Sequence, residues 1–242
     1  KSSLLSVSYK DDVETAAPLP VKQSLVLLGV LLLATLVIFG LALGLAALLG
    51  SDAVIAVLTA AVGVHGVSMI AIIQVALRRA GSGWRALGFR PPTWRLLHLM
   101  WQLPLMLLVL VGVQATISAL TGMDPAGSGA GVDSLLAGAT PGAVAVLIVG
   151  IVVLVPIWEE ATFRGVIYVG LVRRFSPAVA VFGSAAAFAV CHGVPILLPY
   201  MFRAGVSLAL LRRFHRTLWG SVLAHMGLNG LVTAGTVLAL IG

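Results

Sequence analysis

Long stretches without a charged residue constrain this chain more than any other feature of its sequence. Six such stretches follow one another: Lys22 to Asp52, Asp52 to Arg78, Arg95 to Asp124, Asp133 to Glu159, Arg174 to Arg203, and Arg216 to the end. Each exceeds the roughly 20 residues with which a helix crosses a bilayer. The chain is 60% hydrophobic and 10% charged, which leaves too little polar surface to cover these stretches in water. Because lipid offers the backbone no hydrogen-bond partners, we expect an all-α, polytopic membrane helix bundle.

The sequence predicts a polar N-terminal tail over residues 1–22 and a single transmembrane domain over residues 23–242. About seven transmembrane helices are expected, at residues 24–49, 53–77, 96–120, 142–163, 177–194, 196–211 and 217–241. The sixth of these is short and contains Arg203, so a tilted or re-entrant segment is an alternative there. The role of Arg203 is left open by the sequence.

The basic residues predict the orientation of the bundle. They gather in alternate loops, which hold Arg78, Arg79, Arg85, Arg90, Arg95, Arg173, Arg174, Arg212, Arg213 and Arg216, whereas the loops between hold neither Lys nor Arg. Because cytoplasmic loops carry the excess of Lys and Arg, the N-terminus is predicted to be cytoplasmic. The Gly-, Pro- and aromatic-containing linker over residues 81–94 is expected to lie on the cytoplasmic membrane surface. The composition favours a multi-pass protein of a cell membrane, of the bacterial inner-membrane kind, with lipid and no nucleic acid as its surroundings.

Two glutamates and an arginine stand where lipid disfavours charge. Glu159, Glu160 and Arg164 form the pattern EExxxR at the end of a long apolar stretch. Glu160 and Arg164 are four residues apart, so they share one face of a helix and can pair. Glu159 lies about 100° further round the helix. One glutamate therefore has a built-in partner, and the other is free to act as a general base.

Two further polar pairs follow on separate predicted helices. Phe188 and His192 form FxxxH, and His225 and Asn229 form HxxxN, so the members of each pair lie one turn apart. A neutral histidine in apolar surroundings can hydrogen-bond a carboxylate or a water. The imidazole and amide of the second pair can both donate to a developing oxyanion.

The three motifs in this order resemble those of the CPBP family, which includes the CAAX prenyl proteases of the Rce1 type and the bacterial Abi proteins. The resemblance covers roughly residues 140–232. It extends to Phe163-Arg164-Gly165, which is similar to the FRG that follows the glutamates in that family, and to the segment 216–221 before the HxxxN motif. Residues 1–130 match the family only as generic spans.

The resemblance implies a glutamic intramembrane endopeptidase that hydrolyses a peptide bond in a membrane-associated or peptide substrate. Glu159 and His192 would bind and activate a water, while His225 and Asn229 would form the oxyanion hole. Three residues would support this site: Glu160, Arg164 and Phe188. No cofactor is implied. From the predicted topology we expect the site to open towards the cytoplasmic side.

Two alternatives remain open from the sequence. Two Glu and two His are legitimate zinc ligands, so the same residues could serve a metal-dependent intramembrane protease; no HExxH motif is present. A non-catalytic membrane scaffold or bacteriocin-immunity protein could also keep this fold. The identity of the substrate, its lipidation and the oligomeric state cannot be inferred from the sequence.

Four other residues receive structural interpretations. His65 lies between glycines in the second predicted span and is expected to serve helix packing. His98 and His215 lie near the basic loops and are expected to reach towards the membrane surface. Cys191 is expected to be a small buried hydrophobe.

Overall fold

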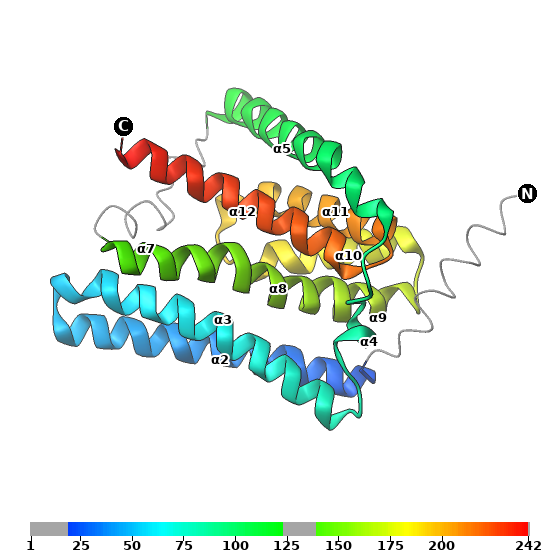
Figure 1. The fold of residues 1–242 in the computed structure, drawn as a ribbon, viewed down its shortest axis with the longest axis horizontal. Helices are drawn as coiled ribbons and strands as arrows, with labels where there is room; N and C mark the ends of the chain where they lie inside the picture. Colours follow the sequence, from blue (N-terminus) through cyan, green and yellow to red (C-terminus); the bar gives the residue numbers. More distant parts are fainter. Residues whose placement is uncertain (1–18, 123–138, 242) are drawn as a thin grey trace, which may run out of the picture.

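The computed structural model describes residues 19–122 and 139–241, and this part of the chain is helical, without strands (Figure 1). The helices, in chain order, are α2 (Val21–Leu49), α3 (Val54–Arg79), α4 (Trp84–Leu87), α5 (Leu99–Thr121), α7 (Pro141–Ile148), η4 (Val149–Leu154), α8 (Val155–Glu160), η5 (Ala161–Ile167), α9 (Tyr168–Val172), α10 (Pro177–Cys191), α11 (Leu198–His215) and α12 (Leu218–Ile241). Short 3₁₀ turns, η1 (Ser51–Ala53), η2 (Trp94–His98) and η6 (Pro195–Leu197), precede α3, α5 and α11. The prediction of an all-α bundle is confirmed, whereas the predicted tail over residues 1–22 lies almost wholly outside the described residues.

Helices occupy all seven predicted positions, and five of them are long and apolar enough to cross a membrane. These five are Val21–Leu49, Ser51–Arg79, Trp94–Leu120, Pro141–Val172 and Leu218–Leu238. The fourth continues nine residues past its predicted end at residue 163. α10 is apolar but has only 15 residues, and the 18 residues of α11 include Arg203, Arg212 and Arg213. The structure thus supports a multi-pass membrane protein, with α10 and α11 differing from the other five.

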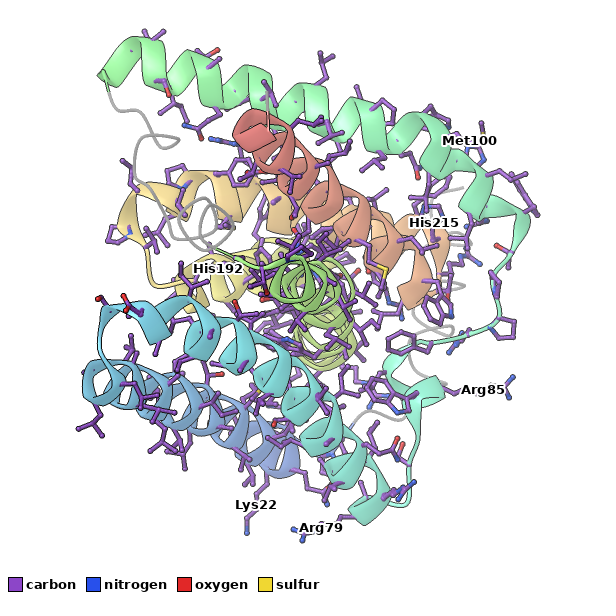
Figure 2. All side chains as sticks on the ribbon, turned by 60° about the vertical axis from the view of Figure 1, so that its left-hand side comes forward. Lys22, Arg79, Arg85, Met100, His192 and His215 are labelled. Atoms are coloured by element: carbon purple, nitrogen blue, oxygen red, sulfur yellow. The ribbon has the colours of Figure 1, made fainter. Side chains whose placement is uncertain are left out.

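The helix over Pro141–Val172 lies at the centre of the bundle, where Figure 2 views it nearly end-on. It runs through α7, η4, α8, η5 and α9, and both η4 and η5 are π-helical. Glycines allow α3 to approach η4 closely. A Cβ on Gly66 would lie 2.7 Å from Leu154 Cβ, and a Cβ on Gly150 would lie 2.7 Å from a methyl group of Val62. α10 and α12 pack on the same central helix, so every sequence motif is held against it.

Polar side chains connect α5 to the rest of the bundle, from which much of its length stands apart in Figure 1. Arg203 of α11 donates through Nη2 to Gln114 Oε1 of α5 at 2.9 Å. At the other end of the same two helices, His215 Nε2 and Gln102 Oε1 are 2.8 Å apart. Leu110 is fully buried between these two contacts. Arg203, for which the sequence offered no role, therefore joins two helices.

Part of the linker over residues 81–94, which was expected on the membrane surface, packs into the bundle. Leu87 is 1% exposed and packs against Gly165, where a Cβ would lie 3.0 Å from Leu87 Cβ. The carbonyl of Gly88 accepts a hydrogen bond of 2.7 Å from the backbone N–H of Leu218 at the start of α12. Trp84, Phe89 and Trp219 form an edge-to-face series beside these contacts.

His215 is buried rather than reaching towards the membrane surface, and its environment predicts acid sensitivity. Burial, with smaller effects of His98 and Arg95, lowers the pKa of His215 to about 4. In the unfolded chain this group binds a proton near pH 6.5, so the unfolded state takes up protons first as the pH falls. The free energy of unfolding should therefore be unaffected by this group above pH 6.5 and should decrease as the pH falls from 6.5 towards 4. Melting temperatures of the detergent-solubilised protein between pH 8 and 4 measure this.

The matched variant is His215→Gln, whose amide can still donate to Gln102 but does not titrate. Its melting temperature should depend less on pH over this interval than that of the wild type. Equal pH dependence in the two proteins would show that His215 is not the group responsible.

Candidate active site

The structure brings together the four residues for which a catalytic role was predicted. Glu159 comes from α8, His192 caps the end of α10, and His225 and Asn229 lie one turn apart on α12. All four line one cavity of about 310 Å³. Residues separated by up to 70 positions in the sequence thus meet at a single site inside the bundle.

Glu160 and Arg164 form a buried ion pair beside this cavity, as their spacing predicted. Arg164 Nη1 lies 2.7 Å from Glu160 Oε1, and both side chains are fully buried. Arg164 also donates through Nη2 to the backbone carbonyl of Gly205 on α11 at 3.0 Å. Gly205 packs so tightly on α10 that a Cβ there would lie 2.9 Å from Ala185 Cα. The pair therefore connects the central helix to α10 and α11.

His225 lies between the two glutamates. Its Nδ1 is 3.1 Å from Glu160 Oε1, and its Nε2 is 3.8 Å from Glu159 Oε2. A carboxylate that is paired with an arginine can only accept, so the hydrogen of this bond belongs to Nδ1 of His225. Glu160 thereby fixes the ring orientation and leaves Nε2 facing Glu159.

Glu159 is buried but has no direct partner for one of its oxygens. The Oε2 atom is inaccessible and makes no hydrogen bond to the described protein atoms. Its 3.8 Å separation from His225 Nε2 is too long for a direct hydrogen bond. A buried polar group without a protein partner is commonly satisfied by water, and Glu159 lines the cavity in which a water can be held. The arrangement suits a water held in the cavity beside Glu159.

His192 and Asn229 each make one hydrogen bond and keep a second polar group available. His192 Nδ1 lies 2.7 Å from the carbonyl of Phe188, which places the ring hydrogen on Nδ1 and leaves Nε2 as the acceptor. Asn229 donates through Nδ2 to the carbonyl of Ile151 at 2.9 Å. Ile151 lies in the π-helical segment η4. Because an amide nitrogen carries two hydrogens, Asn229 keeps a second donor.

Phe188 packs among the charged and imidazole groups. Its ring centroid is 4.6 Å from that of His192 and 5.8 Å from that of His225. The guanidinium carbon of Arg164 lies 4.5 Å from the same centroid, within the range of a cation–π contact. The aromatic ring thus holds the two histidines and the arginine at fixed spacing.

Other polar residues of the spans have structural places. His65 is buried against Phe39 and Trp158, and its Nε2 is 2.9 Å from Thr35 Oγ1, which fits the predicted packing role. Cys191 is exposed, so the expectation of a buried hydrophobe was wrong; it is the last residue of α10, where the helix leaves the bundle.

Tyr200 lines the same cavity and was not singled out from the sequence. It lies in the first turn of α11, directly after Pro199, and a tyrosine among otherwise apolar residues there was the available signal.

The cavity extends from Glu159 in the direction opposite to that expected. The lining residues beyond Glu159 and His225, such as Ile151, Tyr200 and Thr233, lie towards the ends of their helices that carry no basic loop. Figure 2 shows His192 to the left of the central helix and His215 and Arg85 to its right. The prediction of a site open to the cytoplasmic side is therefore not supported by the shape of the cavity.

Residues 19–122 and 139–241 provide no preformed set of metal ligands. Within these ranges the structure brings together no group of three or more His, Cys, Asp or Glu side chains in an arrangement that could hold a metal ion. The His and Glu side chains of the site engage one another and the backbone instead.

One comparison with known proteins matches the part of the chain that builds this site. Residues 141–231 match the family model of the type II CAAX prenyl endopeptidases, Rce1-like. Searches of curated proteins and of solved structures found no match. The matched segment begins with the central helix at Pro141 and ends just after Asn229, so it contains all the predicted site residues. Residues 141–231 of this multi-pass membrane protein are therefore similar to an Rce1-like endopeptidase domain, and that family is one of proteases.

Proposed function

We propose that this protein is an intramembrane endopeptidase of the glutamic type, which uses its own side chains and no cofactor. The observation that supports it best is the environment of Glu159. This buried carboxylate has one oxygen without a protein partner, faces an imidazole at 3.8 Å, and lines a cavity together with two further hydrogen-bonding residues. A base, a place for water and donors for an oxyanion are what peptide hydrolysis requires around one carbonyl.

In the proposed reaction, Glu159 and His192 position a water beside the scissile carbonyl carbon. The Glu159 carboxylate takes one proton from the water as the water oxygen forms its bond to that carbon. The carbonyl oxygen becomes an oxyanion, which Asn229 and His225 stabilise. Glu159 then gives its proton to the peptide nitrogen as the C–N bond breaks, so the products are a free acid and a free amine and the enzyme is restored.

His225 can stabilise the oxyanion only if it carries two ring protons, because Nδ1 already donates to Glu160. Both ring nitrogens then donate in the proposed reaction, Nδ1 to Glu160 and Nε2 to the developing oxyanion. Glu160 therefore acts as a positioning residue: it touches neither water nor substrate in the proposal but holds His225 in place.

Asn229→Ala should slow cleavage by about 10²- to 10³-fold, as is typical for removal of one oxyanion donor. The affected quantity is kcat, since the donor acts on charge that appears only in the transition state. A matched control is Thr233→Ala, one turn further along α12 in the lining of the same cavity, which should change kcat little. The prediction is checked by single-turnover rates of both variants; equal effects of the two substitutions would contradict it.

The experiment that tests the function compares membrane and secreted proteomes of cells that carry the wild type, Glu159→Gln or a full deletion. Glutamine keeps the size of the side chain but cannot take a proton from water. A precursor that accumulates equally in the variant and in the deletion, with loss of its product, supports the proposal and names the substrate. A deletion phenotype that Glu159→Gln does not reproduce would instead favour a non-catalytic scaffold or immunity protein.

Independence from metal ions is tested on the purified protein. We expect cleavage to survive exhaustive dialysis against a chelator and to remain unchanged on addition of zinc. Loss of activity on dialysis, with recovery on zinc addition, would favour the metal-dependent alternative.

A further inference from the structure

The charged residues distinguish the two ends of the bundle. Lys22 lies in the first turn of α2, Arg78 and Arg79 end α3, and further arginines follow α9 and lie in the last turn of α11, all at one end. At the other end, the described loops comprise the turn with Asp52 and residues 192–197. These loops contain neither Lys nor Arg. The excess of Lys and Arg places the first end in the cytoplasm. In Figure 2, Lys22, Arg79 and Arg85 mark this end, and His192 lies away from it.

The burial of the cavity lining changes along the membrane normal. Glu159, Leu208 and His225 form the deep part and are buried. Towards the end without basic loops the lining becomes partly exposed, at Tyr200 and Asn229. The cavity is therefore closed near Glu159 and His225. It opens towards the end of the bundle without basic loops, where the α12 residues after His225 lie.

The cytoplasmic end of the same site is sealed by residues 84–90, which we call the inner plug. Leu87 of the plug contacts Gly165, one residue after Arg164 of the ion pair. The carbonyls of Gly88 and Arg90 accept hydrogen bonds from Leu218 N–H and from Thr217 Oγ1. Such buried backbone hydrogen bonds hold the plug against the start of α12.

The layer between the inner plug and His225 is also filled. Leu218, Ser221 and Val222 of α12 are each 0% exposed, as are Arg164 and Tyr168 of the central helix. Interiors packed in this way leave no room for a chain to pass. Among residues 19–122 and 139–241, this packed layer closes the cytoplasmic side of the site to an extended peptide.

We propose that the substrate reaches Glu159 from the non-cytoplasmic side of the membrane. The inference rests on the proposed protease function and specifies its substrate class: a membrane-anchored protein or exported peptide whose scissile bond lies at the non-cytoplasmic end of its membrane segment. A tail confined to the cytoplasm would meet the inner plug. The largely apolar lining of the cavity suits the apolar side chains that flank such a bond.

Labelling with a membrane-impermeant maleimide tests this, because the chain holds a single cysteine. Cys191 is exposed at the end of α10 beside His192 and reports the orientation in the wild type. Val232→Cys in a Cys191→Ala background reports the cavity itself, because Val232 lines the cavity and is exposed. Met201→Cys in the same background, on α11 across the cavity, serves as a second reporter should the first variant fail to fold. Arg85→Cys marks the cytoplasmic end. Each is labelled in intact cells and in inside-out vesicles.

We expect Cys191 and the cavity cysteines to be labelled in intact cells, and Arg85→Cys to be labelled only in inside-out vesicles. Labelling of Cys191 only in inside-out vesicles would overturn the orientation. Cavity cysteines that react only in inside-out vesicles, or in neither preparation, would overturn the open side. Labelling does not require catalysis, so the outcome is independent of whether Glu159→Gln abolishes cleavage.

Discussion

Glu159→Gln is expected to reduce the single-turnover rate of peptide cleavage by about 10²- to 10⁴-fold, the usual contribution of a general base. The glutamine amide fills the same volume and can hold a water, but it cannot accept the proton that the water must lose. Because Glu159 carries no ion pair with an arginine and its Oε2 has no protein partner, the fold should be retained. Rates and melting temperatures of the detergent-solubilised variant measure both effects.

The control for this substitution is Asp52→Asn, which removes a carboxylate in the exposed turn η1 between α2 and α3. Its cleavage rate should equal that of the wild type. A Glu159→Gln protein that cleaves at the rate of this control would exclude Glu159 as the base.

Arg164→Met is expected to destabilise the fold by about 3–5 kcal/mol, the range measured when one partner of a buried ion pair is removed. Glu160 would keep its charge in a fully buried position with only His225 as a partner. The loss of the bond to the Gly205 carbonyl would also loosen the contact with α11. Denaturation of the purified protein should show this as a large decrease in melting temperature, with Arg85→Met, on the exposed surface, as the near-neutral control.

The double variant Glu160→Gln, Arg164→Met separates charge from packing. With the carboxylate replaced by a neutral amide, no unpaired charge remains, so part of the lost stability should return relative to Arg164→Met. A double variant as unstable as the sum of the two single variants would mean that the residues do not act as a pair.

The sequence contained enough information to predict the membrane spans and the residues that gather at the site. Uncharged stretches predict spans because lipid excludes charge, and the i, i+4 spacing of Glu160 and Arg164 predicts their pairing because a helix turns every 3.6 residues. Both depend on interactions local in the chain.

What the sequence did not predict depends on contacts between distant segments. Leu87 and Gly88 lie in a linker whose composition suggests a membrane surface, yet they fit under the central helix because Gly165 leaves room for them. His215 lies among arginines, but a glutamine more than a hundred residues earlier, Gln102, supplies its buried partner. The direction in which the cavity opens follows from such packing, and periodicity alone carries no information about it.

The central claim is that Glu159, His192, His225 and Asn229 act as one catalytic unit around one bound water. The most direct measurement compares cleavage rates of Glu159→Gln, His225→Gln and the double variant. Residues that act as a unit give non-additive effects, so the double variant should be about as slow as the slower single variant. Rate losses that multiply in the double variant would show that the two residues act independently and would contradict the account.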